Sequence, residues 1–121
     1  MTISTILVVD DSPTDRQHLS DMLSRSGFKV STAESAEDAL AKVKQLRPDL
    51  VLMDVVMPGQ NGFQATRMLK KDESTKDIPV ILCTSKGQET DKVWGMRQGA
   101  RDYIVKPVVQ AELLAKIAAL G

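Results

Sequence analysis

Short runs of consecutive apolar residues alternate along the chain with longer stretches in which apolar residues recur every three or four positions. A run without polar residues is typical of a strand that is buried on both faces, whereas the recurring pattern is typical of a helix with one buried face. We expect buried strands at residues 6–9, 50–53, 78–83 and 103–105, and a brief strand at residues 28–32, where apolar positions alternate. A helical stretch follows each of them, so strand and helix alternate about five times.

Residues that start or stop helices stand at the ends of these helical stretches. Ser12 and Pro13 form a helix start, because Ser caps the first turn and Pro is tolerated within it. Gly27 ends that helix, while Ser35 and Pro48 bound the next one. Strands and helices that alternate in this way form a parallel sheet covered by helices on both faces. The pattern therefore predicts an α/β fold, a doubly wound sandwich.

The composition fits one globular domain of 121 residues, in which 42% of the residues are apolar and 26% are charged. The 16 Lys and Arg residues balance the 16 Asp and Glu residues (16 − 16 = 0), which argues against a nucleic-acid partner. Cys83 is the single cysteine, so an internal disulfide is excluded. No apolar run approaches the roughly 20 residues of a membrane span, and the N-terminus lacks a secretory signal pattern. We therefore expect a cytoplasmic protein without membrane insertion.

Polar residues follow the ends of four predicted strands. They are Asp10 and Asp11 after the first strand, Asp54 after the third, Thr84 and Ser85 after the fourth, and Lys106 after the fifth. The carboxyl ends of parallel strands share one edge of the sheet, where such folds bind their ligands. We therefore expect three carboxylates, a pair of hydroxyls and an ammonium group around one small site.

Three carboxylates at one site need a cation, because two like charges about 4 Å apart repel by about 4 kcal/mol at an effective dielectric constant of about 20. Oxygen ligands without His or Cys favour Mg²⁺ or a similar hard ion. The Lys106 ammonium and the Thr84 hydroxyl suit a phosphoryl group. Asp54 stands alone after a buried strand, and a carboxylate can act as a nucleophile and become an aspartyl phosphate. These residues thus predict phosphoryl chemistry on Asp54.

Five motifs resemble, in the same order, those of CheY-like receiver domains of response regulators. They are Val8-Val9-Asp10-Asp11-Ser12, Leu52-Met53-Asp54 with Met57-Pro58, Gly62, Thr84-Ser85 and Lys106-Pro107. The resemblance covers the whole chain and implies a single receiver domain over residues 1–121, without an output domain. It also implies a flavodoxin-like fold, a five-stranded parallel sheet in the order 2-1-3-4-5.

The same resemblance implies a metal site and a phosphoacceptor. Asp54 is the expected phosphoacceptor. Mg²⁺ is expected to bind Asp10, Asp11 and Asp54, together with the backbone carbonyl of Val56. A domain of this kind catalyses only its own phosphorylation and dephosphorylation, so no further enzyme activity is expected.

A switch is implied as well. Lys106 is expected to contact a phosphoryl oxygen and, with Asp54 and Thr84, makes up the expected catalytic set. Thr84 is expected to move its hydroxyl toward the phosphoryl group, and Tyr103 matches the aromatic residue that turns inward with it. The peptide bond between Lys106 and Pro107 is expected to be cis, which an X-Pro bond permits.

Two further stretches are similar to the type IV pilus regulators, the PilH-type proteins of twitching motility and the PixH-type proteins of phototaxis. They are residues 83–87 and residues 91–100, in which the pair Trp94-Gly95 is distinctive. The second stretch lies in the expected fourth helix, which in receivers forms the partner surface with the fifth strand and fifth helix. Trp94 and Tyr103 are the candidate contact residues. The resemblance thus implies a CheA-like sensor histidine kinase as phosphodonor, and a protein of the pilus or motility machinery as output partner.

Particular residues bear on the alternative functions. An enzyme of the haloacid dehalogenase type would carry a second acid two residues after its nucleophile, where this chain has Val56. A nucleotide-binding domain of the Rossmann type would need a Gly-x-Gly-x-x-Gly or P-loop pattern, and neither is present. A phosphate sink for a shared kinase is compatible with the residues, and a docking module that works without phosphorylation is the remaining alternative.

Overall fold

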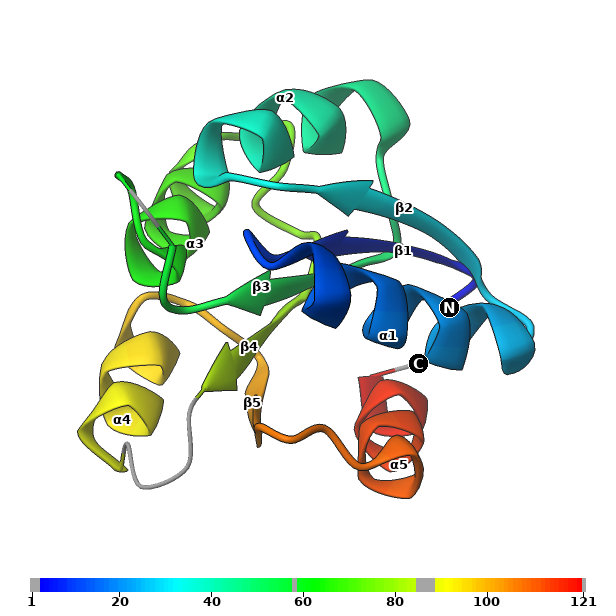
Figure 1. Ribbon diagram of the computed structural model, residues 1–121. Helices are drawn as coiled ribbons and strands as arrows, with labels where there is room; N and C mark the ends of the chain where they lie inside the picture. The colour runs from blue at the N-terminus through cyan, green and yellow to red at the C-terminus, as the bar shows by residue number, and fades with distance from the viewer. Residues whose placement is uncertain (1–2, 58, 85–88, 121) are drawn as a thin grey trace.

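The computed structural model describes residues 3–57, 59–84 and 89–120, and within them five strands alternate with five helices (Figure 1). In chain order the elements are β1 (Thr5–Val9), α1 (Pro13–Arg25), β2 (Lys29–Ala33), α2 (Ala36–Leu46), β3 (Leu50–Asp54), α3 (Gly62–Lys71), β4 (Val80–Thr84), α4 (Glu89–Arg97), β5 (Asp102–Val105) and α5 (Gln110–Leu120). This alternation confirms the α/β fold that the apolar pattern predicts.

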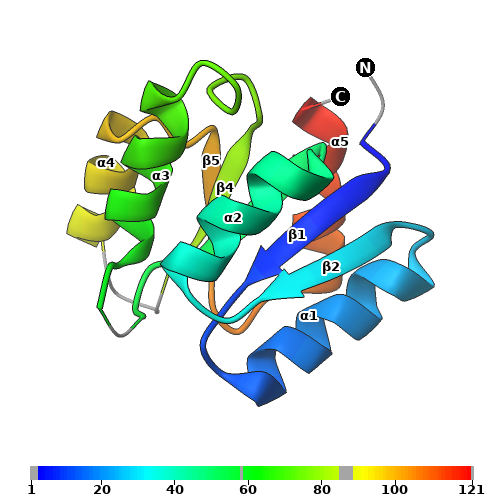
Figure 2. The ribbon, with the colours of Figure 1, turned by 90° about the horizontal axis from the view of Figure 1, so that it is seen from above.

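The strands form one parallel sheet in the order β2-β1-β3-β4-β5, as the family resemblance implies. The central strand β1 pairs with both neighbours, so that Val8 lies opposite Thr32 on β2 and opposite Leu52 on β3. Helices α1 and α5 cover one face of the sheet, and α2, α3 and α4 cover the other (Figures 1 and 2). None of the helices in the described part of the chain is long and apolar enough to cross a membrane.

Each face of the sheet has its own apolar core, because successive side chains of a strand point to opposite faces. The core under α1 and α5 includes Ile6, Val8, Leu19, Leu23, Leu50, Leu52, Leu113 and Ile117. The core under α2 and α3 includes Leu7, Val9, Ala39, Val43, Val51, Met53, Leu69 and Leu82. The strands β3 and β4 are buried along their whole length, as their continuous apolar runs predict. The edge strand β2 instead alternates between exposed and more buried positions.

Two strands begin later than the sequence pattern predicts, and backbone hydrogen bonds explain both differences. The Phe28 N–H donates to the carbonyl of Leu23 at 3.2 Å, so Phe28 still belongs to the turn that closes α1. The Ile78 N–H donates to the carbonyl of Thr75 at 3.0 Å, and Pro79 has no N–H to give to a strand partner. The predicted strand starts at residues 28 and 78 were therefore wrong by one and two residues.

The helix starts and stops agree with the capping residues in the sequence. The Ser12 hydroxyl accepts a hydrogen bond from the Asp15 N–H at 3.3 Å, and the Ser35 hydroxyl accepts one from the Asp38 N–H at 3.1 Å. Gly27 follows α1 with a φ of 97°, a conformation that glycine adopts without strain. These caps fix where α1 and α2 begin, and therefore how the loops after β1 and β2 leave the sheet.

Candidate functional site

The polar residues singled out in the sequence meet at the carboxyl edge of the sheet. Asp10 follows β1, Asp54 and Thr84 are the last residues of β3 and β4, and Lys106 follows β5. Asp54 and Thr84 thus belong to strands rather than to the loops in which the apolar runs placed them. The Lys106 N–H donates to the Thr84 carbonyl at 2.7 Å, which ties the ends of β4 and β5 together. Ser85 lies outside the described residues.

Three carboxylates come together at this edge. Asp10, Asp11 and Asp54 each offer an oxygen, and the three oxygens lie within 4.8 Å of one another. Asp10 and Asp54 are buried, whereas Asp11 is exposed. A set of carboxylate oxygens open to solvent on one side fits a hard divalent cation such as Mg²⁺. Val56 lies two residues after Asp54 with an exposed side chain, and its carbonyl as a fourth ligand stays a prediction.

The Lys106 ammonium lies among carboxylates. Its Nζ is 3.0 Å from Asp10 Oδ2, 3.0 Å from Asp54 Oδ1 and 3.3 Å from Asp15 Oδ2. Asp10 and Asp54 are the partners that the predicted site contains. Asp15 is an additional partner that the residues at the strand ends did not indicate.

The spacing of Ser12 and Asp15 is the only signal of Asp15 in the sequence. An acidic residue three positions after a Ser cap is the pattern of a capping box, in which the acid accepts a hydrogen bond from the N–H of the cap. In this structure the Ser12 N–H donates to Asp10 Oδ1 at 3.0 Å, and Asp15 contacts Lys106 instead. Sequence spacing predicts the local bond, but not the contact with a residue 91 positions away.

Burial raises the pKa of Asp54 to about 6, against an ordinary value of 3.8. The hydrogen bond from Lys106 opposes this rise, and the neighbouring charges of Asp10 and Asp11 add to it. Burial also acts to lower the pKa of Lys106, but its hydrogen bonds to Asp54 and Asp10 outweigh burial and hold that pKa above the usual value. Lys106 therefore stays charged at neutral pH, and the pKa of Asp54 lies only slightly below neutral pH.

Thr84 is the buried hydroxyl of the site. Its side chain is 1% exposed, and Oγ1 has no hydrogen-bond partner among the residues described here. Buried polar atoms are normally paired, and an unpaired one costs stability. The role of Thr84 as a switch residue stays a prediction.

Gly62, at the start of α3, packs against the backbone of Asp54. A Cβ at this position would lie 2.2 Å from the Asp54 carbonyl oxygen, far inside van der Waals contact. The Gly62 N–H also donates to the Val55 carbonyl at 3.0 Å. This close approach holds the end of β3 and thereby the position of the Asp54 carboxylate.

The peptide bond between Lys106 and Pro107 is cis, as expected. Tyr103 is half-buried, packs beside the core under α2 and α3, and has the Lys116 ammonium 5.2 Å from its ring centre. Trp94 is 52% exposed on α4. A turn of Tyr103 and a partner contact through Trp94 and Tyr103 stay predictions.

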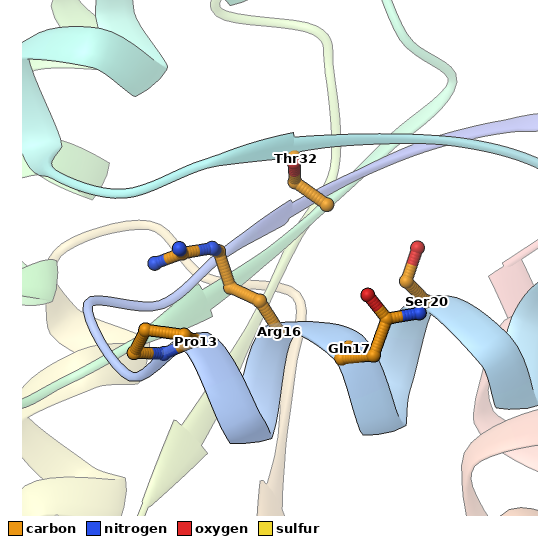
Figure 3. Close-up of a pocket in the computed structure, with 5 residues that line it drawn as sticks. All are labelled: Pro13, Arg16, Gln17, Ser20 and Thr32. Carbon is orange, nitrogen blue, oxygen red and sulfur yellow. The ribbon is translucent and has the colours of Figure 1, made fainter.

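A polar groove of about 270 Å³ lies on the α1 side of the edge strand β2. Figure 3 shows Arg16, Gln17 and Ser20 on α1 and Thr32 on β2 lining it, with Pro13 at one end. Arg16 also donates to the Asp10 carbonyl at 2.8 Å, which braces the loop after β1. The groove contains none of the carboxylates of the site, so it is separate from the place where a phosphoryl group would bind.

Comparisons with known proteins agree with this site. The family model of the response regulator receiver domain matches residues 6–118. The chain is 57% identical to the protein PilH of Pseudomonas aeruginosa, over 98% of both chains. It is 41% identical to the phosphate regulon transcriptional regulatory protein PhoB of the same species, over 99% of this chain but only 52% of PhoB.

Solved structures give the same result. The chemotaxis protein CheY4 of Vibrio cholerae superposes with a TM-score of 0.91 at 31% identity, over 99% of this chain and all of that one. The resemblance to CheY-like receivers and to PilH, which the motifs suggested, is confirmed. By its matched family model, its identity to PilH and its fold, this chain belongs to the response regulator receiver domain family.

Proposed function

We propose that this chain is a switch of a two-component phosphorelay, in which Asp54 accepts a phosphoryl group from a sensor histidine kinase when Mg²⁺ is bound. One observation supports this most strongly. The buried Asp54 carboxylate lies in a group with Asp10 and Asp11 and is 3.0 Å from the Lys106 ammonium. Such a group combines a nucleophile, the ligands for a divalent cation and a cation for a phosphoryl oxygen.

In the proposed step the phosphoryl group moves from an oxygen or nitrogen atom of the donor to a carboxylate oxygen of Asp54. An Asp54 carboxylate oxygen donates an electron pair to the phosphorus atom, and a phosphorus–oxygen bond forms. The bond from phosphorus to the donor breaks at the same time, and its electron pair leaves with the donor. With acetyl phosphate the products are an Asp54 acyl phosphate and acetate, and no proton is gained or lost by the protein.

Each neighbouring residue has a definite task in this proposal. Asp10, Asp11 and Asp54, with the carbonyl of Val56, would hold Mg²⁺, which when bound supplies positive charge beside the phosphoryl oxygens. Lys106 orients a phosphoryl oxygen from the side of β5. The Thr84 hydroxyl has no partner among the described residues, and the carbonyl of the same residue accepts from the Lys106 N–H; we propose that the hydroxyl would donate to the phosphoryl group once it is attached.

The output is proposed to be protein contact through the surface of α4, β5 and α5, with residues 1–121 acting as one cytoplasmic receiver unit. On α4 the side chains of Val93, Trp94 and Met96 are exposed, whereas Gly95 packs on Leu82 inside the protein. The 57% identity to PilH supports a partner in the pilus or motility machinery and a CheA-like kinase as the donor.

The proposal is tested by the intact mass of the protein after incubation with acetyl phosphate and Mg²⁺. The expected result is a single phosphoryl adduct on the wild type that needs Mg²⁺ and is absent from Asp54→Asn. Asp21→Asn is the matched control, because it removes one carboxylate from α1 without touching the site.

Two results would count against the proposal. An adduct of equal yield on Asp54→Asn would place the acceptor elsewhere. A folded wild-type protein that gains no phosphoryl group, either from acetyl phosphate or from a CheA-like kinase, would indicate a docking module that works without phosphorylation.

A further inference from the structure

Asp15 contacts the site from outside its group of three carboxylates. It lies in the first turn of α1, with a side chain that is 49% exposed, and its Oδ2 is 3.3 Å from Lys106 Nζ. The N–H of the same residue donates to the Ser12 hydroxyl, which fixes the turn that carries it. The contact therefore joins α1 to the loop after β5, across the edge where the phosphoryl group is expected.

The Lys106 ammonium contacts three different carboxylates: it donates hydrogen bonds to Asp10 and Asp15 and forms an ion pair with Asp54. A lysine has three N–H donors and no acceptor. Its partners are Asp10 at 3.0 Å, Asp54 at 3.0 Å and Asp15 at 3.3 Å. Carboxylates thus surround the ammonium group on three sides.

These three partners differ in what else they can bind. Asp10 and Asp54 belong to the group of carboxylates that fits a cation, and Asp15 does not. A cation that binds Asp10 and Asp54 competes with Lys106 for the negative charge of these two carboxylates. Among the carboxylates that the structure places on Lys106, Asp15 is the one whose contact a cation leaves intact.

We propose that Asp15 is a positioning residue that anchors the Lys106 ammonium. Asp10 and Asp54 can then bind Mg²⁺ while the contact with Asp15 keeps Lys106 beside the phosphoryl position. The inference rests on the proposed function in so far as Mg²⁺ and a phosphoryl group are the ligands. Without Asp15, Lys106 has only Asp10 and Asp54 as carboxylate partners among the described residues. It then binds these two carboxylates more strongly, and the cation binds them more weakly. Asp15 acts through Lys106 and does not itself bind the metal.

Asp15→Asn tests this, with Asp21→Asn as the control of equal charge. Asp21 lies on the same helix, accepts a hydrogen bond from Gln17 at 2.7 Å and does not contact Lys106. The affinity for Mg²⁺ is measured on the full chain by NMR titration, in the absence of any phosphodonor. We expect Asp15→Asn to weaken Mg²⁺ binding by roughly two- to fivefold, the range for a partly exposed ion pair, and Asp21→Asn to leave it unchanged. Equal affinities of wild type and Asp15→Asn would overturn the inference.

A double-mutant cycle separates positioning from a plain charge effect. If Asp15 acts through Lys106, then Asp15→Asn should weaken Mg²⁺ binding little or not at all in a Lys106→Gln background. A loss as large as in the wild-type background would mean that Asp15 attracts the ion directly, and that result would overturn the inference. Thermal unfolding of each variant shows that it is folded before its affinity is measured.

The anchoring also has a readout that needs no metal. The ammonium ¹⁵N signal of Lys106 should be observable in the metal-free wild type and in Asp21→Asn, because contacts with three carboxylates hold the ammonium group. It should broaden in Asp15→Asn, and an unchanged signal would overturn the anchoring. If the wild type binds no Mg²⁺ at all, the proposed function fails, and this signal still decides whether Asp15 anchors Lys106.

Discussion

Replacing Asp54 by asparagine should raise the free energy of unfolding of the metal-free protein at neutral pH, although it removes the proposed phosphoacceptor. The Asp54 carboxylate is buried beside Asp10 and Asp11, and burial is the largest cause of its raised pKa. In the unfolded chain the same carboxylate is hydrated and ionises freely. Asparagine keeps the shape of the side chain and carries no charge, so it avoids the cost of ionisation in the fold.

The sign and size of the effect follow from the two pKa values. The folded value is about 6 and the ordinary value is 3.8, a difference of about two pH units, and each unit corresponds to about 1.4 kcal/mol. Between these values the folded state holds a proton that the unfolded state has lost, so wild-type stability falls as the pH rises from about 4 to about 6. The pKa of about 6 already includes the favourable interaction with Lys106, so we expect the variant to gain up to about 3 kcal/mol above pH 6 and almost nothing at pH 4.

Urea unfolding followed by circular dichroism, at several pH values between 4 and 8 with a chelator present, measures this difference. The control is Asp21→Asn, which removes a carboxylate of α1 that bonds Gln17 and does not contact the site. A variant that is less stable than the wild type at pH 7.5 would refute the reasoning. So would a gain that does not change with pH, because then the ionisation of Asp54 would not be its cause.

Four further substitutions or treatments test other parts of the structure. Gly62→Ala should cost about 1–3 kcal/mol in urea unfolding, because its Cβ would overlap the Asp54 carbonyl; an unaltered midpoint would show that α3 can move away. Thr84→Val should be neutral or add up to about 1 kcal/mol, since it removes an unsatisfied buried hydroxyl, and a clear loss would reveal a partner for that hydroxyl. Asn61→Ala should cost about 1 kcal/mol by removing the capping box of α3, which thermal unfolding can detect. The Cys83 thiol, whose pKa burial raises to about 12, should react with a thiol reagent at pH 8 only in unfolded protein, and rapid labelling of native protein would contradict its burial.

Much of the fold follows from the apolar pattern, because buried parallel strands need continuous apolar runs. The runs at residues 6–9 and 50–53 locate β1 and β3 to within one residue. The strand order does not follow from the apolar pattern, because alternating strands and helices are compatible with several strand orders. The resemblance to the family motifs implied the order. The apolar pattern does not predict strand ends either, because Ile78 is apolar but its N–H donates a hydrogen bond within a turn.

The site could be predicted as far as it depends on strand ends. Asp10, Asp54 and Lys106 lie where the ends of parallel strands must meet, and their charges indicate the chemistry. The contact of Asp15 could not be predicted, because a helix cap and a lysine 91 residues away are brought together only by the packing of α1 beside the sheet. The sequence likewise does not predict that the Thr84 hydroxyl has no partner among the described residues, because the fold determines which groups surround it.

The charge of the site links its stability to its proposed chemistry. Asp10, Asp11, Asp15 and Asp54 contribute four negative charges and Lys106 one positive charge, so the ionised site carries −4 + 1 = −3 without a cation. A phosphoryl group on Asp54 would replace one negative charge by about two, which makes the metal-free product still less favourable. A divalent cation offsets two of these charges in either state. The electrostatics that destabilises the metal-free fold therefore also makes phosphorylation depend on Mg²⁺, and Asp54→Asn should show both effects: more stability than the wild type in a chelator, and a smaller gain in stability when Mg²⁺ is added.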